Sequence, residues 1–295
     1  MSFTKRVIEE LIGAEQGKTC CRKATVCGLF WGASLLDGKV VSAEFSSAEA
    51  AEYAAGILTK NFFASPEIKR TGRAGRYWYS VTAQSKALWA LLQNADNEAD
   101  ARVIPEIAGF KCEECAHAFS KGAFIALGHI NDPRKSYHLE FLLSPPVRAK
   151  RLADFLSSQV GEIKTIQREH RMGIYYKRNM LITDLLYHIR AMKTAFDYSD
   201  ICIENEIRNR ETRATNFVAS NISKSVEASQ RQITAIEELV ATGAMLKLPE
   251  EIIYTARLRI ENPDATLSEL ARLHEPPISK SGLNRRLNRI LEEWE

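Results

Sequence analysis

The cysteines are the first residues in this chain whose types and spacing could do chemistry. The segment "CEECAH" places Cys112, Cys115 and His117 at a spacing typical of half a zinc site, and the adjacent pair Cys20-Cys21 could supply the other half. Structural zinc usually takes two short-spaced ligand pairs, and an adjacent pair offers poor tetrahedral geometry. Because the chain also starts without an export signal, we predict reduced thiols and no metal site.

A second set of chemically suited residues lies close to the C-terminus. The segment from Lys280 to Leu291 contains no acidic residue, and Leu283, Leu287 and Ile290 recur in it at helical spacing. The remaining positions carry cations or polar donors that could reach phosphates and base edges in a DNA groove. The predicted DNA-binding residues are Lys280, Ser281, Asn284, Arg285, Arg286, Asn288 and Arg289. The alternative is the solvated face of an ordinary basic helix.

A third set of cations falls in two predicted hairpins, interleaved with tyrosine and tryptophan. Its members are Arg70, Arg73, Arg76, Arg168, Arg171, Lys177 and Arg178, with His170 beside them. A DNA-facing surface would use such side chains for phosphate contacts. A surface for a protein partner, or exposed hairpins without a binding role, would show the same pattern. The set is therefore predicted as a secondary surface for DNA or for a partner.

The composition is that of a globular protein of 295 residues, with 45% hydrophobic and 26% charged residues. The formal net charge is only +3, so any contact with nucleic acid must come from local patches rather than from the whole chain. No stretch approaches the ~18 apolar residues that a membrane helix needs. We therefore expect a soluble cytoplasmic protein that makes no membrane contact.

The chain contains an internal repeat. Gly28 lies 94 residues before Gly122, and Tyr77 lies 98 residues before Tyr175, as expected for two copies that differ by a few loop residues. Each copy is predicted to run helix, strand, helix, two strands and helix. In the first copy the predicted elements are 20–33, 39–45, 47–61, 66–72, 76–82 and 84–92, with "TGRAG" as a hairpin turn. In the second copy they are 117–128, 136–143, 146–159, 163–169, 173–178 and 181–191, with "HRMG" as the turn.

The repeat and the polar segments around it predict the domain boundaries. They are an N-terminal extension at 1–19, a first repeat at 20–92, a linker at 93–111, a second repeat at 112–207, a linker at 208–216 and a helical domain at 217–295. In the last domain, helices are predicted at 217–241, 249–261, 267–274 and 280–293. Thr266 and Glu269 form a capping box at the start of the third helix.

The duplicated unit resembles the LAGLIDADG homing endonucleases. In that family two motif helices pack side by side, each ends in an acid that helps to hold a catalytic divalent metal, and the flanking sheets form a saddle over DNA. Placing "GLFWGAS" and "GAFIALG" on the motif puts Ala33 and Leu127 at the acid positions. Neither side chain can bind a hard cation. The resemblance implies an α+β fold in which a duplicated αββαββα LAGLIDADG-like domain, without the nuclease chemistry, precedes an all-α helix-turn-helix domain.

Three segments together are similar to the WhiA family of bacterial DNA-binding regulators, which is linked to sporulation and cell division. They are "CCRKA", "GAFIALGHINDPRKSYHLEF" and "PDATLSELARLHEPPISKSGLNRRLNRI". The resemblance implies a nucleoid-associated transcription regulator that is not an enzyme, uses no cofactor and binds double-stranded DNA. RNA polymerase or another regulator would be a further partner. The alternatives are a protein-interaction scaffold in cell division or chromosome organisation, and an active nuclease, which would need acids at positions 33 and 127.

Overall fold

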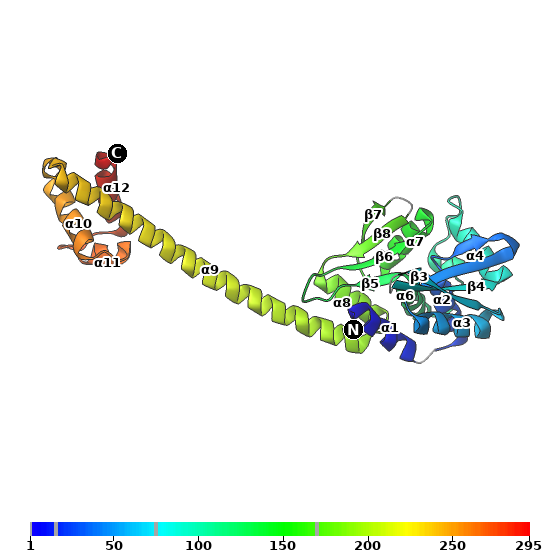
Figure 1. The fold of residues 1–295 in the computed structure, drawn as a ribbon. Coiled ribbons are helices and arrows are strands. Elements are labelled where there is room, and N and C mark those ends of the chain that lie inside the picture. The colour runs from blue at the N-terminus through cyan, green and yellow to red at the C-terminus, as the bar shows by residue number, and fades with distance from the viewer. Residues whose placement is uncertain (1, 15–16, 74–75, 169–170) are drawn as a thin grey trace. The chain divides into compact units, whose positions relative to one another are not determined.

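The computed structural model describes residues 2–14, 17–73, 76–168 and 171–295. The chain divides into two compact units, Met1–Glu206 and Ile207–Glu295 (Figure 1). Each unit has its own cluster of buried hydrophobic residues, as expected for a separately packed domain. Within the described ranges, no helix is both long enough and apolar enough to cross a membrane.

Unit 1 contains the two predicted copies. The first comprises α2 (Thr19–Leu29), β1 (Ser34–Leu36), β2 (Val40–Phe45), α3 (Ala48–Phe62), β3 (Glu67–Arg73), β4 (Arg76–Gln84) and α4 (Lys86–Asp96). The second comprises α6 (Glu114–Leu127), β5 (Gly128–Ile130), β6 (Leu139–Leu143), α7 (Pro146–Gln159), β7 (Lys164–Arg168), β8 (Arg171–Tyr176) and α8 (Asn179–His188). The strands form two antiparallel sheets of equal order, β1-β2-β4-β3 and β5-β6-β8-β7. The α+β class and the duplicated αββαββα order are thus confirmed.

The short strands β1 and β5 are absent from the predicted residue ranges. The helix predicted over 20–33 ends at Leu29, and β1 begins at Ser34, while β5 follows α6 directly at Gly128. Each strand has three residues, which is too short to show an alternating pattern. Their strand conformation depends on pairing with the longer strands β2 and β6.

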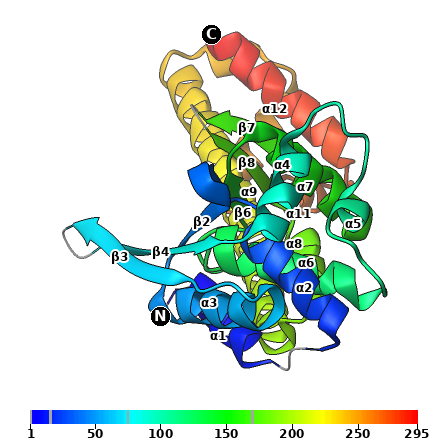
Figure 2. The same ribbon diagram turned by 90° about the vertical axis from the view of Figure 1, so that its right-hand side faces the viewer.

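The two predicted hairpins are present. Strands β3 and β4 pair as far as Arg73 and Arg76, and strands β7 and β8 pair as far as Arg168 and Arg171. The predicted turns "TGRAG" and "HRMG" include residues 74–75 and 170, which lie outside the described residues. Figure 2 shows the β3–β4 hairpin extending away from the helices of unit 1.

Helices α2 and α6 form the centre of unit 1. A Cβ atom added at Gly28 would lie 2.1 Å from the carbonyl oxygen of Phe119, and one added at Gly122 would lie 2.2 Å from that of Thr25. Real Cβ atoms do not approach backbone oxygens so closely, so the two helices can touch only because glycine occupies both positions. The repeat therefore places its two glycines at the contact between the copies.

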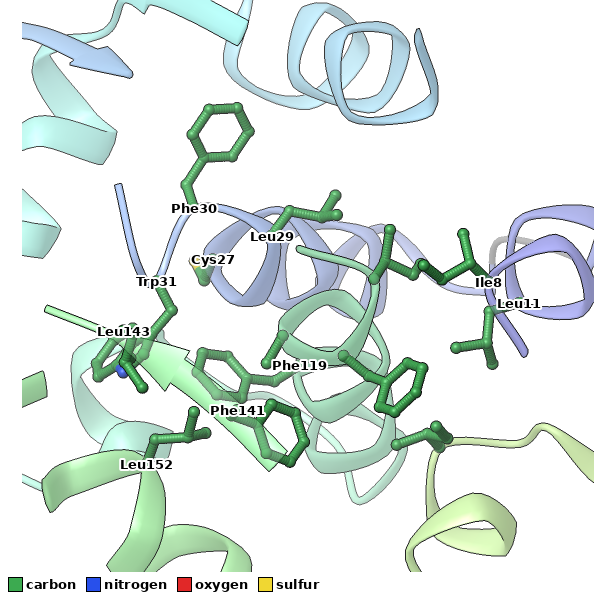
Figure 3. Close-up of a cluster of buried hydrophobic side chains, with 14 of the residues drawn as sticks. Ile8, Leu11, Cys27, Leu29, Phe30, Trp31, Phe119, Phe141, Leu143 and Leu152 are labelled. Carbon is green, nitrogen blue, oxygen red and sulfur yellow. The ribbon is translucent and has the colours of Figure 1, made fainter. Parts of the chain in front are cut away.

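Aromatic side chains fill the space around this helix pair. The rings of Trp31 and Phe119 meet edge to face with their centroids 5.3 Å apart, and both are fully buried. Figure 3 shows them beside Leu143 and Leu152, while Phe30 points to the opposite side of the helices. The second copy thus packs its sheet and α7 against residues that follow α2 of the first.

The predicted N-terminal extension is part of unit 1. It forms α1 (Phe3–Gly13), whose Val7 and Leu11 are fully buried. The carboxylate of Glu10 accepts hydrogen bonds from the backbone N–H groups of Lys193 and Thr194, at 2.7 and 2.9 Å. These amides open helix α9 (Met192–Ala241) and have no partner within it. Glu10 therefore caps the start of α9.

The two predicted linkers differ in structure. In the first, α4 continues to Asp96 and a short helix α5 (Ile104–Ile107) follows. Arg151 donates hydrogen bonds at 2.6–3.0 Å to one carbonyl in the last turn of α4 and to three carbonyls between the two helices. The second, 208–216, is helical and lies inside α9, so the helix begins well before the predicted residue 217. That segment is polar, exposed and free of Gly and Pro, which favours a solvated helix.

Unit 2 contains the end of α9, a 3-10 turn η2 (Ala244–Lys247) and helices α10 (Glu250–Glu261), α11 (Leu267–Arg272) and α12 (Lys280–Trp294). The predicted capping box is present. The Thr266 side chain accepts from the Glu269 amide at 3.3 Å, and the Glu269 carboxylate accepts from the Thr266 amide at 2.8 Å. The order of a capped helix, a turn and a second helix is that of a helix-turn-helix.

Candidate nucleic-acid interface

Helix α12 separates a buried face from a polar face. Leu283, Leu287 and Ile290 are fully buried in the core of unit 2, as predicted. The Ser279 hydroxyl accepts a hydrogen bond from the Gly282 amide at 3.0 Å and so caps the helix start. Six of the predicted DNA-binding residues are exposed on the remaining surface: Lys280, Ser281, Asn284, Arg285, Asn288 and Arg289.

The seventh, Arg286, lies differently. Its guanidinium donates to the Glu251 carboxylate on α10 at 2.7 Å, and its side chain is only 23% exposed. Arg289 lies 3.7 Å from Glu292 in an exposed pair that contributes little to stability. Among the described residues, Lys280 and Arg285 form no ion pair. Their charges are therefore available to a partner, whereas Arg286 fastens α12 to α10.

Two buried polar side chains that the sequence analysis missed hold the unit around α12. Arg259 is 2% exposed and donates to the Ala265 carbonyl at 2.8 Å, which fixes the loop before α11. His274, also 2% exposed, packs edge-on against Tyr254, and burial together with Arg286 lowers its pKa. In the sequence, the one indication of a buried role for Arg259 is its place on the apolar face of the predicted helix 249–261. Arg259 thus ties the loop before α11 to α10, and the buried His274 anchors the α11–α12 turn.

The two positions interpreted as lost acids lie close to the C-terminal ends of α2 and α6, with Ala33 four residues after the end of α2 at Leu29. Ala33 is buried and Leu127 is half-buried. A Cβ atom added at Gly32 would lie 2.6 Å from Leu127 Cδ2, so the leucine fills the space between the two helix ends. Leu127 also lines a pocket of about 570 Å³, whose other lining residues include Glu44, His129 and Arg171.

A divalent nuclease metal does not fit these residues. Such an ion needs carboxylate oxygens, and neither lost-acid position offers one. Across the described ranges, the only group of three or more His, Cys, Asp or Glu side chains with ligand atoms close enough for one metal consists of four cysteines. No such group in the described residues contains a carboxylate.

A buried arginine occupies the first copy's motif end instead. The Arg148 guanidinium donates to the carbonyls of Trp31 and Ala33, both at 2.8 Å, and to the Asp96 carboxylate at 2.7 Å. Its side chain is 3% exposed. Burial lowers the pKa of Arg148 and the Asp96 charge partly offsets this shift. The guanidinium thus donates to two backbone carbonyls just after α2, next to the position interpreted as a lost acid.

We expect Arg148→Met to lower the free energy of unfolding by about 3 kcal/mol, because it strips a partner from two buried carbonyls and from Asp96. Urea denaturation followed by tryptophan fluorescence would measure the change. Lys150→Met is the matched control, since Lys150 is exposed on the same helix and the expected change is within about 0.5 kcal/mol. Equal stability of the two variants would contradict a structural role for Arg148.

The hairpin cations are unequally available. The Arg168 guanidinium lies 2.7 Å from the Glu140 carboxylate, and the Arg70 guanidinium stacks on the Tyr77 ring at 3.6 Å. Arg171, Lys177 and Arg178 are exposed. The side chains of Arg73 and Arg76, and His170 as a whole, lie outside the described part of the structure. Because Arg168 is paired and Arg70 is stacked, fewer cations of the two hairpins are available to a partner than the sequence predicted.

The cysteines that the sequence analysis considered in pairs come together in one cluster. The sulfur atoms of Cys20, Cys21, Cys112 and Cys115 all lie within 4.8 Å of one another. His117 is not among them, and its Nδ1 lies 2.8 Å from the His188 carbonyl oxygen. The prediction of no metal site relied on the poor geometry of an adjacent pair; it stays a prediction, and the fold brings that pair beside Cys112 and Cys115.

Comparisons with known proteins match both units. The family model described as "WhiA C-terminal HTH domain" matches residues 212–293, and the one described as "WhiA LAGLIDADG-like domain" matches residues 116–208. The "Probable cell division protein WhiA" of Alkaliphilus metalliredigens is 30% identical over 310 residues, which cover 98% of this chain and 96% of that protein. The chain therefore belongs to the WhiA family.

A second WhiA relative and a solved structure agree with this assignment. The protein of the same name from Desulfitobacterium hafniense is 30% identical over 307 residues, covering 99% of this chain and 95% of its own. The crystal structure of full-length DUF199/WhiA from Thermotoga maritima matches with a TM-score of 0.60 at 19% identity, covering 100% of this chain and 98% of that one. The fold of this WhiA-family chain is thus shared over its whole length.

The WhiA family models also cover most of the candidate site residues. The matched helix-turn-helix region contains all seven predicted DNA-binding positions of α12, together with Arg259 and His274. The matched LAGLIDADG-like region contains Leu127 and Arg148 but begins well after Ala33. The family model of the LAGLIDADG-like domain therefore matches the second copy of the repeat and not the first.

Proposed function

We propose that this WhiA-family protein is a sequence-specific DNA-binding regulator of transcription and is not a nuclease. The observation that carries the proposal is the polar face of α12, where exposed cations and amides occupy the start of a capped helix fixed to the core. The names of its relatives, probable cell division proteins, support a role in the expression of division genes. Such a protein would act in the cytoplasm, at the nucleoid.

The proposed contacts differ along the helix. Lys280 and Ser281 lie at the helix start and are suited to phosphate oxygens. Asn284, Arg285 and Asn288 lie one and two turns further on the same exposed side, and their side chains suit base edges in the major groove. Arg286 acts as a positioning residue through Glu251 rather than as a DNA contact. A single short helix reads few base pairs, so a second DNA-bound protein, such as RNA polymerase or another regulator, would add specificity.

The absence of nuclease activity rests on residue types. Leucine and alanine at the motif ends can neither bind a metal ion nor activate water. The buried Arg148 guanidinium donates to the Ala33 carbonyl and pairs with Asp96, so neither oxygen that it contacts is free to bind a cation.

Part of unit 1 supports a second function, a surface for a protein partner. Arg168 is neutralised by Glu140 and Arg70 is held against Tyr77, so two of the predicted phosphate contacts are already engaged. We propose that the hairpin surface binds a protein rather than DNA. In that case Arg171→Glu and Lys177→Glu together leave DNA affinity within about threefold of the parent at moderate salt.

The test of the main proposal is equilibrium binding of the full chain to genomic duplex fragments over a series of salt concentrations, with magnesium or with a chelator. We expect fragment-selective binding that weakens steeply with salt, is the same with and without magnesium, and leaves the DNA uncut. Cleavage that depends on magnesium would refute the assignment of Ala33 and Leu127 as lost acids. Equal binding to all fragments at low salt would instead favour the protein-interaction role.

A further inference from the structure

The four-cysteine cluster consists of Cys20, Cys21, Cys112 and Cys115. The sulfur of Cys112 lies 3.5 Å from that of Cys21, 3.6 Å from that of Cys20 and 3.6 Å from that of Cys115. The sulfurs of Cys20 and Cys21 are 4.0 Å apart, and every pair lies within 4.8 Å. All four cysteines are free, since a disulfide would require about 2.05 Å. The four sulfur atoms are therefore close enough to share one central ion.

The fold brings these thiols together from two distant segments. Cys20 and Cys21 lie in the first turn of α2, while Cys112 and Cys115 flank the start of α6, 91 residues beyond Cys21. The glycine contact between α2 and α6 fixes the spacing of the helix starts. An adjacent pair can therefore contribute two ligands, because the partner helix supplies the other half of the set.

We propose that the four-cysteine cluster is a structural site for one Zn²⁺ ion. In a tetrahedral site with Zn–S bonds of about 2.3 Å the sulfur atoms lie about 3.8 Å apart, and four of the six sulfur–sulfur distances, at 3.5–4.0 Å, surround that value. Each thiol that binds releases its proton to solvent, and no oxidation is involved. Four protein ligands close the coordination shell, so the ion has no position for a substrate and is structural rather than catalytic.

The choice of ion follows from ligand type and spacing. Thiolates are soft ligands that select zinc over the hard cations magnesium and calcium. A four-iron cluster would spread its thiolates further apart, because each sulfur would bind a different iron. The resulting site carries two negative charges, and the positive ends of the α2 and α6 dipoles point at it, with Lys18 and Lys111 next to it in sequence.

The site would join the two copies of the repeat at one end of the central helix pair. Leu127 ends α6 and Ala33 follows the C-terminal end of α2, so the zinc site is separate from the position that a nuclease metal would take. Burial supports a structural role, since Cys115 is fully buried and Cys21 is 7% exposed. The ion would link the starts of α2 and α6, two segments far apart in the chain, as a covalent cross-link would.

The first experiment is metal analysis of the full chain, purified without a polyhistidine tag and without chelator. We expect about one zinc per chain in the parent protein and in Cys27→Ala, the control that removes a buried thiol of α2 outside the cluster. Cys112→Ser/Cys115→Ser should lose at least about 90% of the zinc. Cobalt(II) exchanged into the parent should give the intense visible bands of tetrahedral tetrathiolate coordination, and the double variant should not.

A second measurement needs no variant and therefore stands even if the double variant fails to fold. A strong zinc chelator should lower the melting temperature of the parent by at least about 5 °C, and zinc but not magnesium should restore it. A parent protein that contains no zinc and gives no tetrathiolate bands with cobalt would overturn the proposal. So would iron at the same stoichiometry, or zinc that persists in Cys112→Ser/Cys115→Ser.

Discussion

Replacing Lys280 and Arg285 by alanine together is expected to weaken binding of the full chain to its selected duplex by at least about 30-fold. Each side chain is exposed on α12 and, among the described residues, forms no ion pair, so its whole interaction energy is available to DNA. A contact of this kind contributes about 1–3 kcal/mol, and two of them therefore contribute at least about 2 kcal/mol. The slope of log affinity against log salt should also fall by about 0.9 for each phosphate that the variant no longer neutralises.

The control for this variant is Lys224→Ala/Arg257→Ala, which removes the same charge from exposed positions of α9 and α10 in unit 2. Fluorescence anisotropy over several salt concentrations would compare the two. We expect a change of less than about threefold in the control, because only the general attraction to phosphate is reduced. An equal loss of affinity in both double variants would show that binding depends on net charge, and it would contradict the proposal that α12 recognises the DNA sequence.

Gly122→Ala should lower the free energy of unfolding of unit 1 by about 3 kcal/mol. Its new methyl group would lie 2.2 Å from the carbonyl oxygen of Thr25, and backbone on the partner helix cannot move without displacing the core around it. The methyl group of Gly28→Ala would lie 2.1 Å from the Phe119 carbonyl oxygen, so this variant should lose a similar amount of stability. Urea denaturation followed by tryptophan fluorescence would report the change, since Trp31 is buried next to this contact.

Gly56→Ala is the matched control for the helix glycines. Gly56 lies within α3, and a Cβ atom added there would meet nothing within 4 Å. Alanine is the better helix former, so this variant should gain about 0.5–1 kcal/mol. A loss of stability in Gly56→Ala as large as that in Gly122→Ala would mean that helix glycines matter here for a reason other than close packing.

The sequence by itself determined the features that depend on neighbours along the chain. The capping box at Thr266 and Glu269, the buried stripe of Leu283, Leu287 and Ile290, and most element positions in both copies could be predicted from local pattern and from the repeat. The interpretation of Ala33 and Leu127 as missing acids follows from alignment with a motif and needs no coordinates. The helical course of 208–216 was missed because its polar, unpatterned sequence resembles a loop.

Only the tertiary structure decided which distant residues meet. Two three-residue strands exist because longer partners pair with them, and Arg148 is buried because carbonyls 115 and 117 residues earlier in the chain accept its hydrogen bonds. The adjacent cysteines Cys20 and Cys21 look unsuited to a tetrahedral site until α6 brings Cys112 and Cys115 beside them. Spacing along the chain sets the geometry within one segment, whereas a site shared by two segments depends on how closely their helices pack, and here two glycines set that distance.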